Sequence, residues 1–296
     1  MYYLIYGLLY LLSLLPWPVL YFIGDCACWI LYDVMGYRKN VVMNNLKIAF
    51  PEKTDQELKT IARKFYHNFV DTFIEAIKII SVSKQEIARR FVSDFSVMDE
   101  LIQQGKNIQI HAMHNFNWEI ANWELSMRLR IPLLVVYMPI QNKAINKIFM
   151  DLRSQFGAIL LPATDFRSKF RPYINKRYAL GLVADQSPGD PGLAYWLPFF
   201  GVLTPFVTGP EKGARLNNTA VVFLNFYKLK RGYYKIDCTL VTTDPRSLPE
   251  GELTRRFVHY LEEKIRERPD NYLWSHRRWK MQYKEEYAAR RIDKVT

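Results

Sequence analysis

The chain has 296 residues, of which 49% are apolar and 15% aromatic, so it is long enough to bury the core of one large domain. Lysine and arginine exceed aspartate and glutamate by 12, and the resulting positive potential attracts anionic lipid, acidic protein or nucleic acid. The sequence has no zinc-finger spacing, RNP-like motif or basic-region heptad, so nucleic acid is not favoured as a partner.

The first part of the chain is apolar. Residues 1–24 contain no charged side chain, and as one helix they would rise roughly 36 Å, enough to cross a hydrocarbon core of about 30 Å. Pro16 and Pro18 interrupt this pattern, which predicts either one kinked span or two short helices. An Arg-Lys pair follows and, by the positive-inside rule, keeps the rest of the chain in the cytoplasm. We expect residues 1–36 to be an N-terminal membrane-anchoring helix; a buried core helix is the alternative.

Two helices are expected next. Phe50-Pro51 ends the first, and Thr54 with Glu57 forms a capping box that starts a second helix reaching about Ser81. The apolar face of this second helix is most simply core. It contains Leu58, Ile61, Phe65, Phe69 and Phe73.

A strand followed by a helix holds the first candidates for chemistry. Apolar and polar residues alternate over 108–112, which predicts a strand, and Asn115 or Asn117 suits the N-cap of the next helix. With His114 on the turn and Glu119 in the first helical turn, the two side chains can meet. An imidazole is a general base near neutral pH when a carboxylate holds its other ring nitrogen. The plainer alternative is a loop histidine and an acid that only stabilises the helix start.

Strands and helices alternate in the middle of the chain. Strands are expected at 132–138, 158–161 and 178–184, and helices at 142–156 and 165–176. This alternation predicts an α/β fold with a central, mostly parallel sheet flanked by helices. Ligands of such sheets lie at the carboxyl ends of the strands, where His114 and Asp185 both fall.

The last part of the chain predicts a hairpin and a helix. Two strands, at 219–227 and 233–241, are joined by a basic tip, and an amphipathic helix occupies 253–266. We find no internal repeat, so residues 37–296 are treated as one domain.

Several motifs resemble one family of enzymes. His114 to Glu119, H-N-F-N-W-E, fits the His-x4-Asp/Glu motif of the glycerolipid and lysophospholipid acyltransferases. Its Asn-Trp-Glu ending resembles the branch with the late acyltransferases of lipid A biosynthesis, which add lauroyl or myristoyl groups. The Ala-Phe-Pro-Glu run that ends at Glu52 and the closing W-S-H-R-R-W at 274–279 are similar to elements of that branch. The resemblance covers nearly the whole chain and implies a glycerolipid acyltransferase-like fold.

The resemblance also implies the site. It makes His114 and Glu119 the general-base pair, and it matches Arg153 to an Arg-x-x-x-Gly element that ends at Gly157. The other implied substrate-binding residues are Asp185, Gln186, Phe200, Gly201, Thr208, Gly209, Glu211, His276, Arg277 and Arg278. Simpler interpretations remain open: Arg153 as a solvated helix residue, Asp185 in a turn, Phe200 in the core, and the closing element as a membrane-interface belt or a phosphate grip.

The implied reaction is acyl transfer. A fatty acyl group would pass from a thioester of acyl carrier protein or CoA to a hydroxyl of a lipid A precursor, at the cytoplasmic side of the bacterial inner membrane. An apolar groove beside His114 is expected, because each buried methylene contributes about 0.8 kcal/mol. No Gly-x-Ser-x-Gly elbow supplies a nucleophile. The alternatives are an acyltransferase for a lysophospholipid, an aminoacyl lipid or a glycolipid, and a non-catalytic basic membrane protein.

No cofactor or metal is expected. His111 and His114 are close in sequence, but the His-Glu-x-x-His spacing of a zinc site is absent, and His111 is interpreted as a strand-end residue. Cys26 and Cys28 have no second pair of ligands beside them. The odd, sparse set of three cysteines, with Cys238 as the third, favours a reducing, cytosol-facing environment.

Overall fold

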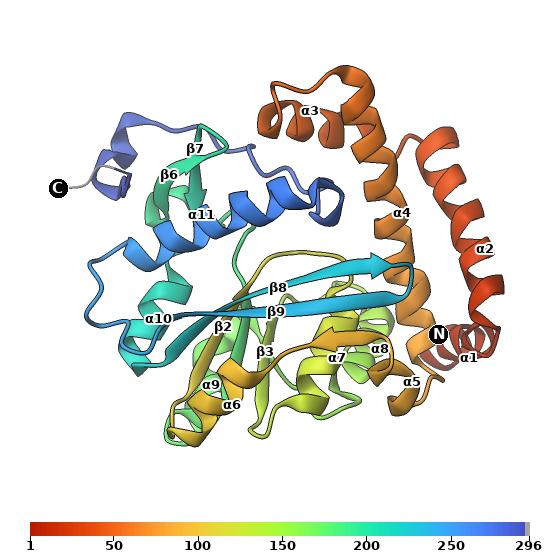
Figure 1. Cartoon of the computed structure of the whole chain (residues 1–296), viewed down its shortest axis with the longest axis horizontal. Coiled ribbons are helices and arrows are strands. Elements are labelled where there is room, and N and C mark those ends of the chain that lie inside the picture. Colours follow the sequence, from red (N-terminus) through yellow and green to blue (C-terminus); the bar gives the residue numbers. More distant parts are fainter. Residues whose placement is uncertain (294–296) are drawn as a thin grey trace.

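A mixed sheet forms the centre of the computed structural model, which describes residues 1–293 (Figure 1). Its seven strands lie in the order β1-β9-β8-β2-β5-β3-β4, and every pair of neighbours is parallel except β8 and β9. The strands are β1 (Phe91–Ser93), β2 (Ile108–Ala112), β3 (Leu133–Tyr137), β4 (Ile159–Pro162), β5 (Ala179–Val183), β8 (Ala220–Lys230) and β9 (Tyr233–Thr242). The predicted α/β class with a mostly parallel central sheet is confirmed.

Helices cover both faces of this sheet (Figure 1). The α-helices are α1 (Tyr2–Ser13), α2 (Trp17–Trp29), α3 (Lys39–Ala49), α4 (Asp55–Ile79), α5 (Lys84–Ala88), α6 (Ser96–Gln103), α7 (Trp118–Arg128), α8 (Lys143–Ser154), α9 (Phe166–Phe170), α10 (Gly209–Asn217) and α11 (Glu252–Glu267). Alternate side chains of a strand point to opposite faces. Val221 and Phe223 of β8 therefore join the cluster formed with α4 and α11, whereas Val222 and Leu224 join the cluster formed with α6 and α7.

The predicted capping box is present at the start of α4. The Thr54 side chain accepts a hydrogen bond from the backbone N–H of Glu57, and the Glu57 carboxylate accepts one from the backbone N–H of Thr54. These contacts satisfy two donors that a helix start leaves free. The helix expected at 165–176 is wrong in length, because α9 ends at Phe170 and the chain continues through Pro172 in one short 3-10 turn (Arg171–Tyr173).

A small hairpin lies outside the main sheet, and the sequence patterns did not predict it. Strands β6 (Tyr195–Phe199) and β7 (Val202–Phe206) pair antiparallel and join at Phe200-Gly201, where both residues have positive φ, of 50° and 76°. Each strand contains a proline, and a proline in the sequence argues against a strand. A sheet of only two strands tolerates Pro198 and Pro205, because both of its strands are edges.

The apolar N-terminal segment forms two helices. α1 ends before Pro16, and α2 continues through a π-helical turn (Ile30–Val34). Among the described residues, no helix taken singly has the length and hydropathy to cross a membrane, but α1 and the Trp17–Val34 helix together do, as a pair bent by 117°. Leu20, Cys28 and Tyr32 of this segment are buried in the core beside α4.

A buried polar network ties these helices to the central sheet and to the start of α7. The Glu75 carboxylate of α4 accepts hydrogen bonds from the hydroxyls of Tyr21 (3.1 Å) and Tyr234 (2.7 Å) and from the side-chain amide of Asn117 (3.3 Å). Glu75 is completely buried, and this burial raises its pKa from 4.5 to about 7. Asp71, one turn earlier, forms ion pairs with two basic residues of the β8–β9 hairpin.

We expect the Glu75→Gln substitution to change how stability depends on pH. Between pH 4.5 and about 7 the folded protein retains a proton that the unfolded chain has lost, so the free energy of unfolding falls as the pH rises through this window. The full effect is at most roughly 3 kcal/mol. The glutamine side chain does not titrate, so the variant should gain stability relative to the wild type between pH 5 and pH 8. Urea unfolding at several pH values measures this, with Glu100→Gln, on an exposed part of α6, as the control for lost charge; a pH-independent difference would contradict the assignment.

Candidate active site

The parallel pairing of β2 with β5 brings a histidine and an aspartate together. Ala112 and Val183 lie opposite each other at the ends of these strands, so the residues after them emerge at the same edge of the sheet. His114 Nδ1 lies 2.6 Å from Asp185 Oδ1, and the backbone N–H of His114 donates to Asp185 Oδ2 (3.2 Å). The carboxylate therefore holds both the ring and the backbone of His114.

The electrostatics of this pair favour an ionised aspartate. Asp185 is buried, with 1% of its surface exposed, and burial alone would raise its pKa. The charge of His114 and its two hydrogen bonds outweigh burial, so the pKa of Asp185 lies below its usual value. The His114 side chain keeps 23% of its surface exposed, and its Nε2 lies 3.2 Å from the side-chain nitrogen of Gln186. The ring nitrogen opposite Asp185 therefore faces the Gln186 amide, which a substrate hydroxyl would have to displace.

Glu119 lies where the sequence predicts, in the first turn of α7, but its partner differs from the predicted one. Its carboxylate accepts three hydrogen bonds from the Arg153 guanidinium of α8: Nε donates to Oε2 (2.9 Å) and Oε1 (3.1 Å), and Nη2 donates to Oε1 (2.5 Å). Among the described residues, no hydrogen bond or ion pair joins Glu119 to His114. The reason is tertiary: His114 faces the neighbouring strand end, where Asp185 arrives, whereas the first turn of α7 packs against α8.

Trp118 lies between the His114–Asp185 pair and the Glu119–Arg153 pair. Its indole N–H donates to Glu119 Oε1 (3.1 Å), and its ring lies edge-on to the ring of His114, with centroids 5.8 Å apart. Burial alone would lower the pKa of Arg153, but the hydrogen bonds and charge of Glu119 raise it. Arg153 is therefore a fixed cation that anchors Glu119, and the solvated-helix interpretation of this residue does not describe its contacts.

The closing basic element also packs against this region. Tyr272 pairs with Asn115, next to His114, and the Ser187 hydroxyl donates to the backbone carbonyl of Arg278 (3.2 Å). Burial lowers the pKa of His276 to about 4 and that of Arg278 to about 10. Two guanidinium nitrogens of Arg278, Nε and Nη1, have no hydrogen-bond partner among the described residues. Buried donors of this kind are costly unless something accepts from them, which makes Arg278 a candidate for contact with an anionic group.

The remaining predicted residues contact other parts of the chain. The backbone N–H of Phe200 donates to Glu262 of α11, and Gly201 completes the β6–β7 turn. Thr208 and Gly209 form the start of α10. Arg277 is exposed. No hydrogen bond, ion pair or ring contact joins any of these residues to His114 within the described part of the chain.

Glu211 has a structural position. It is buried, and its carboxylate accepts hydrogen bonds from the backbone N–H groups of Gly251 (2.6 Å) and Thr254 (2.9 Å) and from the Thr254 hydroxyl (2.6 Å). These are the free donors at the N-terminus of α11. Its contacts therefore cap that helix, and the predicted contact with substrate stays a prediction.

His111 is buried in β2. Its Nε2 lies 2.6 Å from the side-chain nitrogen of Gln109, its ring stacks on Phe223, and burial lowers its pKa to about 3. A neutral, enclosed imidazole of this kind is part of the core. Among residues 1–293 no group of three or more histidine, cysteine, aspartate or glutamate side chains is arranged to hold a metal ion.

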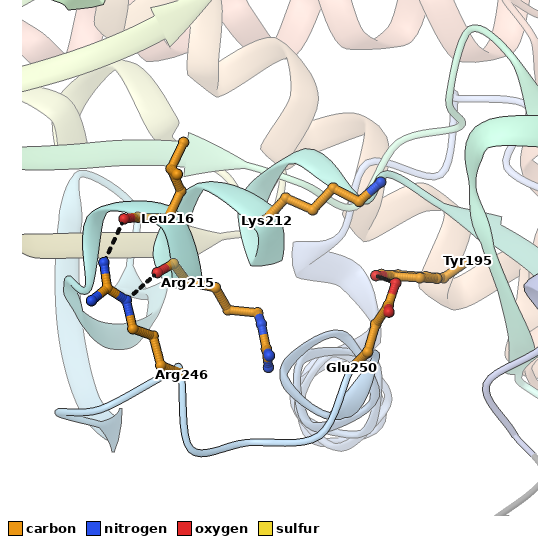
Figure 2. A pocket seen from close by; sticks show the side chains of 6 residues that line it. All are labelled: Tyr195, Lys212, Arg215, Leu216, Arg246 and Glu250. Carbon is orange, nitrogen blue, oxygen red and sulfur yellow. Dashed lines mark hydrogen bonds between the residues drawn. The ribbon is translucent and has the colours of Figure 1, made fainter.

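Two cavities lie away from His114. One, of about 510 Å³, is lined by Tyr195, Lys212, Arg215, Leu216, Arg246 and Glu250 (Figure 2). Arg246 donates to the backbone carbonyls of Arg215 and Leu216 at the end of α10, both at 2.8 Å, so this cation has a structural role. The other cavity, of about 350 Å³, lies between α2 and α4. His114 lines neither, and the apolar groove expected beside it stays a prediction.

We expect Arg153→Ala to destabilise the fold by about 3 kcal/mol, because it leaves the buried Glu119 carboxylate without its partner. Lys147→Ala, on the same helix, is the matched control, since Lys147 forms an exposed pair with Asp151 and should contribute less than about 0.5 kcal/mol. Urea unfolding followed by tryptophan fluorescence measures both changes. Equal effects of the two substitutions would contradict a buried, structural role for the Arg153–Glu119 pair.

Comparison with known proteins identifies the family of this chain. The sequence profile described as bacterial lipid A biosynthesis acyltransferase matches residues 1–281. The chain is 22% identical over 280 residues to the lipid A biosynthesis palmitoleoyltransferase of Escherichia coli (strain K12), and equally to the lipid A biosynthesis acyltransferase of Shigella flexneri. It is 25% identical over 279 residues to the lipid A biosynthesis lauroyltransferase of Escherichia coli (strain K12). Each match covers 93% of this chain and 89% of the relative. The chain therefore belongs to the bacterial lipid A biosynthesis acyltransferase family.

Proposed function

We propose that this protein is an O-acyltransferase that moves a fatty acyl group from a thioester donor to a hydroxyl of a lipid A precursor. Membership in the family supports acyl transfer in lipid A synthesis. The observation that carries the chemistry is the contact between His114 and Asp185 at the carboxyl edge of the sheet. An imidazole held at Nδ1 by an ionised carboxylate has the geometry of a general base once a substrate hydroxyl replaces the Gln186 amide beside its Nε2.

The proposed reaction uses His114 twice. With Nδ1–H donated to Asp185, Nε2 carries the free electron pair and takes the proton of the acceptor hydroxyl. The oxygen attacks the thioester carbonyl carbon, the carbon–sulfur bond breaks, and the imidazolium returns the proton to the leaving thiolate. Asp185 remains ionised throughout and stabilises the imidazolium, which its lowered pKa favours. The products are an ester and a free thiol, and no acyl-enzyme forms.

The other polar residues of the site have positioning roles in this proposal. The sequence motif pairs His114 with Glu119, but the contacts of Glu119 support an indirect role. Glu119 and Arg153 together fix the start of α7. Trp118 is hydrogen-bonded to Glu119 and its ring contacts the His114 ring, so it helps to orient that ring. The free backbone N–H groups in the first turn of α7 are suited to stabilise the oxyanion of the tetrahedral intermediate.

The proposed donor and acceptor indicate where in the cell the protein acts. The donor is proposed to be acyl carrier protein or acyl-CoA, both anionic, and the net charge of +12 favours either. The acceptor is a membrane glycolipid, which places the protein at the bacterial inner membrane with the catalytic residues facing the cytoplasm. No metal or other cofactor takes part in the proposed steps.

The direct test is transfer by purified protein. We expect mixtures of lauroyl-acyl carrier protein and a lipid A precursor to gain the mass of one acyl chain by mass spectrometry. The same donor can be offered with a lysophospholipid as acceptor. Acylation of the lysophospholipid alone would favour the related acyltransferase for another lipid, and no transfer to either acceptor would refute the proposal.

Substitutions test the role of His114 as the general base and of Asp185 as the carboxylate that orients it. His114→Ala and Asp185→Asn should each lower kcat by about 10²–10⁴, because the first removes the base and the second favours the wrong tautomer of the ring. Asp190→Asn is the matched control, since Asp190 is exposed in the loop after β5 and its carboxylate accepts a local hydrogen bond from the backbone N–H of Gly192. Circular dichroism checks folding. If Asp185→Asn kept full activity and Glu119→Gln lost activity, Glu119 and not Asp185 would be the carboxylate that orients His114.

A further inference from the structure

The first two helices carry an unusual amount of exposed apolar surface. Of 27 large apolar side chains exposed among the described residues, 15 lie in the first 37 positions of the chain. We define the outer apolar face as Leu4, Leu8 and Leu11 of α1 with Phe22, Ile23 and Trp29 of α2; these side chains are between 37% and 80% exposed. Exposed apolar surface gathered in one segment in this way marks contact with another molecule or with a membrane.

The inner face of α1 is fastened to the catalytic body at both ends. At its start, the Tyr2 hydroxyl donates to Asp151 of α8 (2.7 Å). At its end, the carbonyl of Ser13 accepts from the Lys78 ammonium and from the Ser81 hydroxyl, both at 2.8 Å and both near the end of α4. Between these points, α1 contacts α4 and α8, and its apolar side chains pack against a cluster that includes Ile148 and Leu152 of α8. The whole length of α1 therefore lies along the folded body.

The inner face of α2 is fastened in the same way. Asp25 forms an ion pair with Arg231 of the β8–β9 hairpin (2.8 Å), and Tyr21 donates to the buried Glu75. At Gly24 the helices approach closely, since a Cβ placed there would come within 3.1 Å of Ile74 in α4. Figure 1 shows α1 and α2 on one flank of the molecule, beside α4. Pulling either helix away would expose these polar groups and the core residues beneath them.

We propose that α1 and α2 remain on the catalytic body and insert their outer apolar face into one leaflet of an anionic bilayer. The chain would then attach from one side only, with both termini in the same compartment. This inference rests on the membrane attachment in the proposed function, but not on the acyl-transfer chemistry.

The observations favour lipid over a second copy of the chain. Residues 1–24 carry no charge, whereas the rest of the chain carries the entire excess of 12 positive charges, a combination suited to apolar insertion and to attraction by anionic headgroups. Tyr3 and Tyr10 on α1 and Trp29 on α2 are also exposed, and such amphipathic rings prefer the membrane interface. α1 has 12 residues and rises about 18 Å, which suits a helix lying along a leaflet.

Topology is the first test. The full chain receives a protease-cleavable tag at each end, and protease is added to sealed spheroplasts and to inverted membrane vesicles. We expect both tags to be cleaved in inverted vesicles and neither in spheroplasts. Cleavage of the N-terminal tag in spheroplasts, with the C-terminal tag cleaved only in inverted vesicles, would show a spanning segment and overturn the inference.

Vesicle flotation is the second test. Purified protein is mixed with vesicles of phosphatidylethanolamine and phosphatidylglycerol, and partitioning is compared with the Leu8→Gln/Leu11→Gln variant. Loss of these two apolar side chains from the bilayer should weaken partitioning at least about tenfold. Leu216→Gln is the matched control, because Leu216 is 77% exposed but lies on α10. Equal losses for both variants would overturn the role of the outer apolar face.

Two further results keep the inference separate from the proposed function. His114→Ala should float like the wild type, since it alters chemistry alone. Wild-type protein that forms a dimer in solution and does not float would show that a second copy covers the face. Wild-type protein that floats with both tags on one side but transfers no acyl group would support the inference while refuting the proposed reaction.

Discussion

The parallel pairing of β2 with β5 is the constraint on which the site depends. Because Ala112 and Val183 end their strands in register, His114 and Asp185 emerge at the same edge of the sheet and meet there. The buried aspartate then needs a donor, and His114 supplies both its ring N–H and its backbone N–H. The low pKa of the Asp185 carboxyl and the orientation of the His114 imidazole therefore both follow from the register of β2 and β5.

Around that pair, buried charges join elements that are distant in sequence. Glu119 ties α7 to α8 through Arg153, and Asp71 ties α4 to the β8–β9 hairpin. Each charge is stable only because its partner is present, since an isolated buried ion costs several kcal/mol. Glu75 differs, because its partners within residues 1–293 are hydroxyl and amide groups and include no ion pair, and burial raises its pKa. Glu75 is hydrogen-bonded both to Tyr21 of α2 and to Asn117 at the start of α7, so one buried carboxylate joins the N-terminal helices to the turn that follows His114.

Family membership and the structure support different parts of the function. The match over residues 1–281 connects the chain to lipid A acyltransferases, and the His-x4-Glu motif names His114 and Glu119 as a pair. The contacts assign the two residues to different partners, His114 to Asp185 and Glu119 to Arg153. A motif records which residues occur together in a sequence, whereas the partner of a side chain depends on which strand or helix arrives beside it.

The sequence by itself determined the class of the fold, the position of β2, the start of α4 and the general place of the site. These features depend on local periodicity, on capping residues and on the rule that ligands lie at the carboxyl ends of parallel strands. It did not determine the β6–β7 hairpin, because prolines in both strands hide the pattern. Only the tertiary structure decided the partner of His114, the capping role of Glu211 and the packing of α1 against α8. Each of these contacts joins residues more than thirty positions apart, and no local pattern records which distant groups will meet.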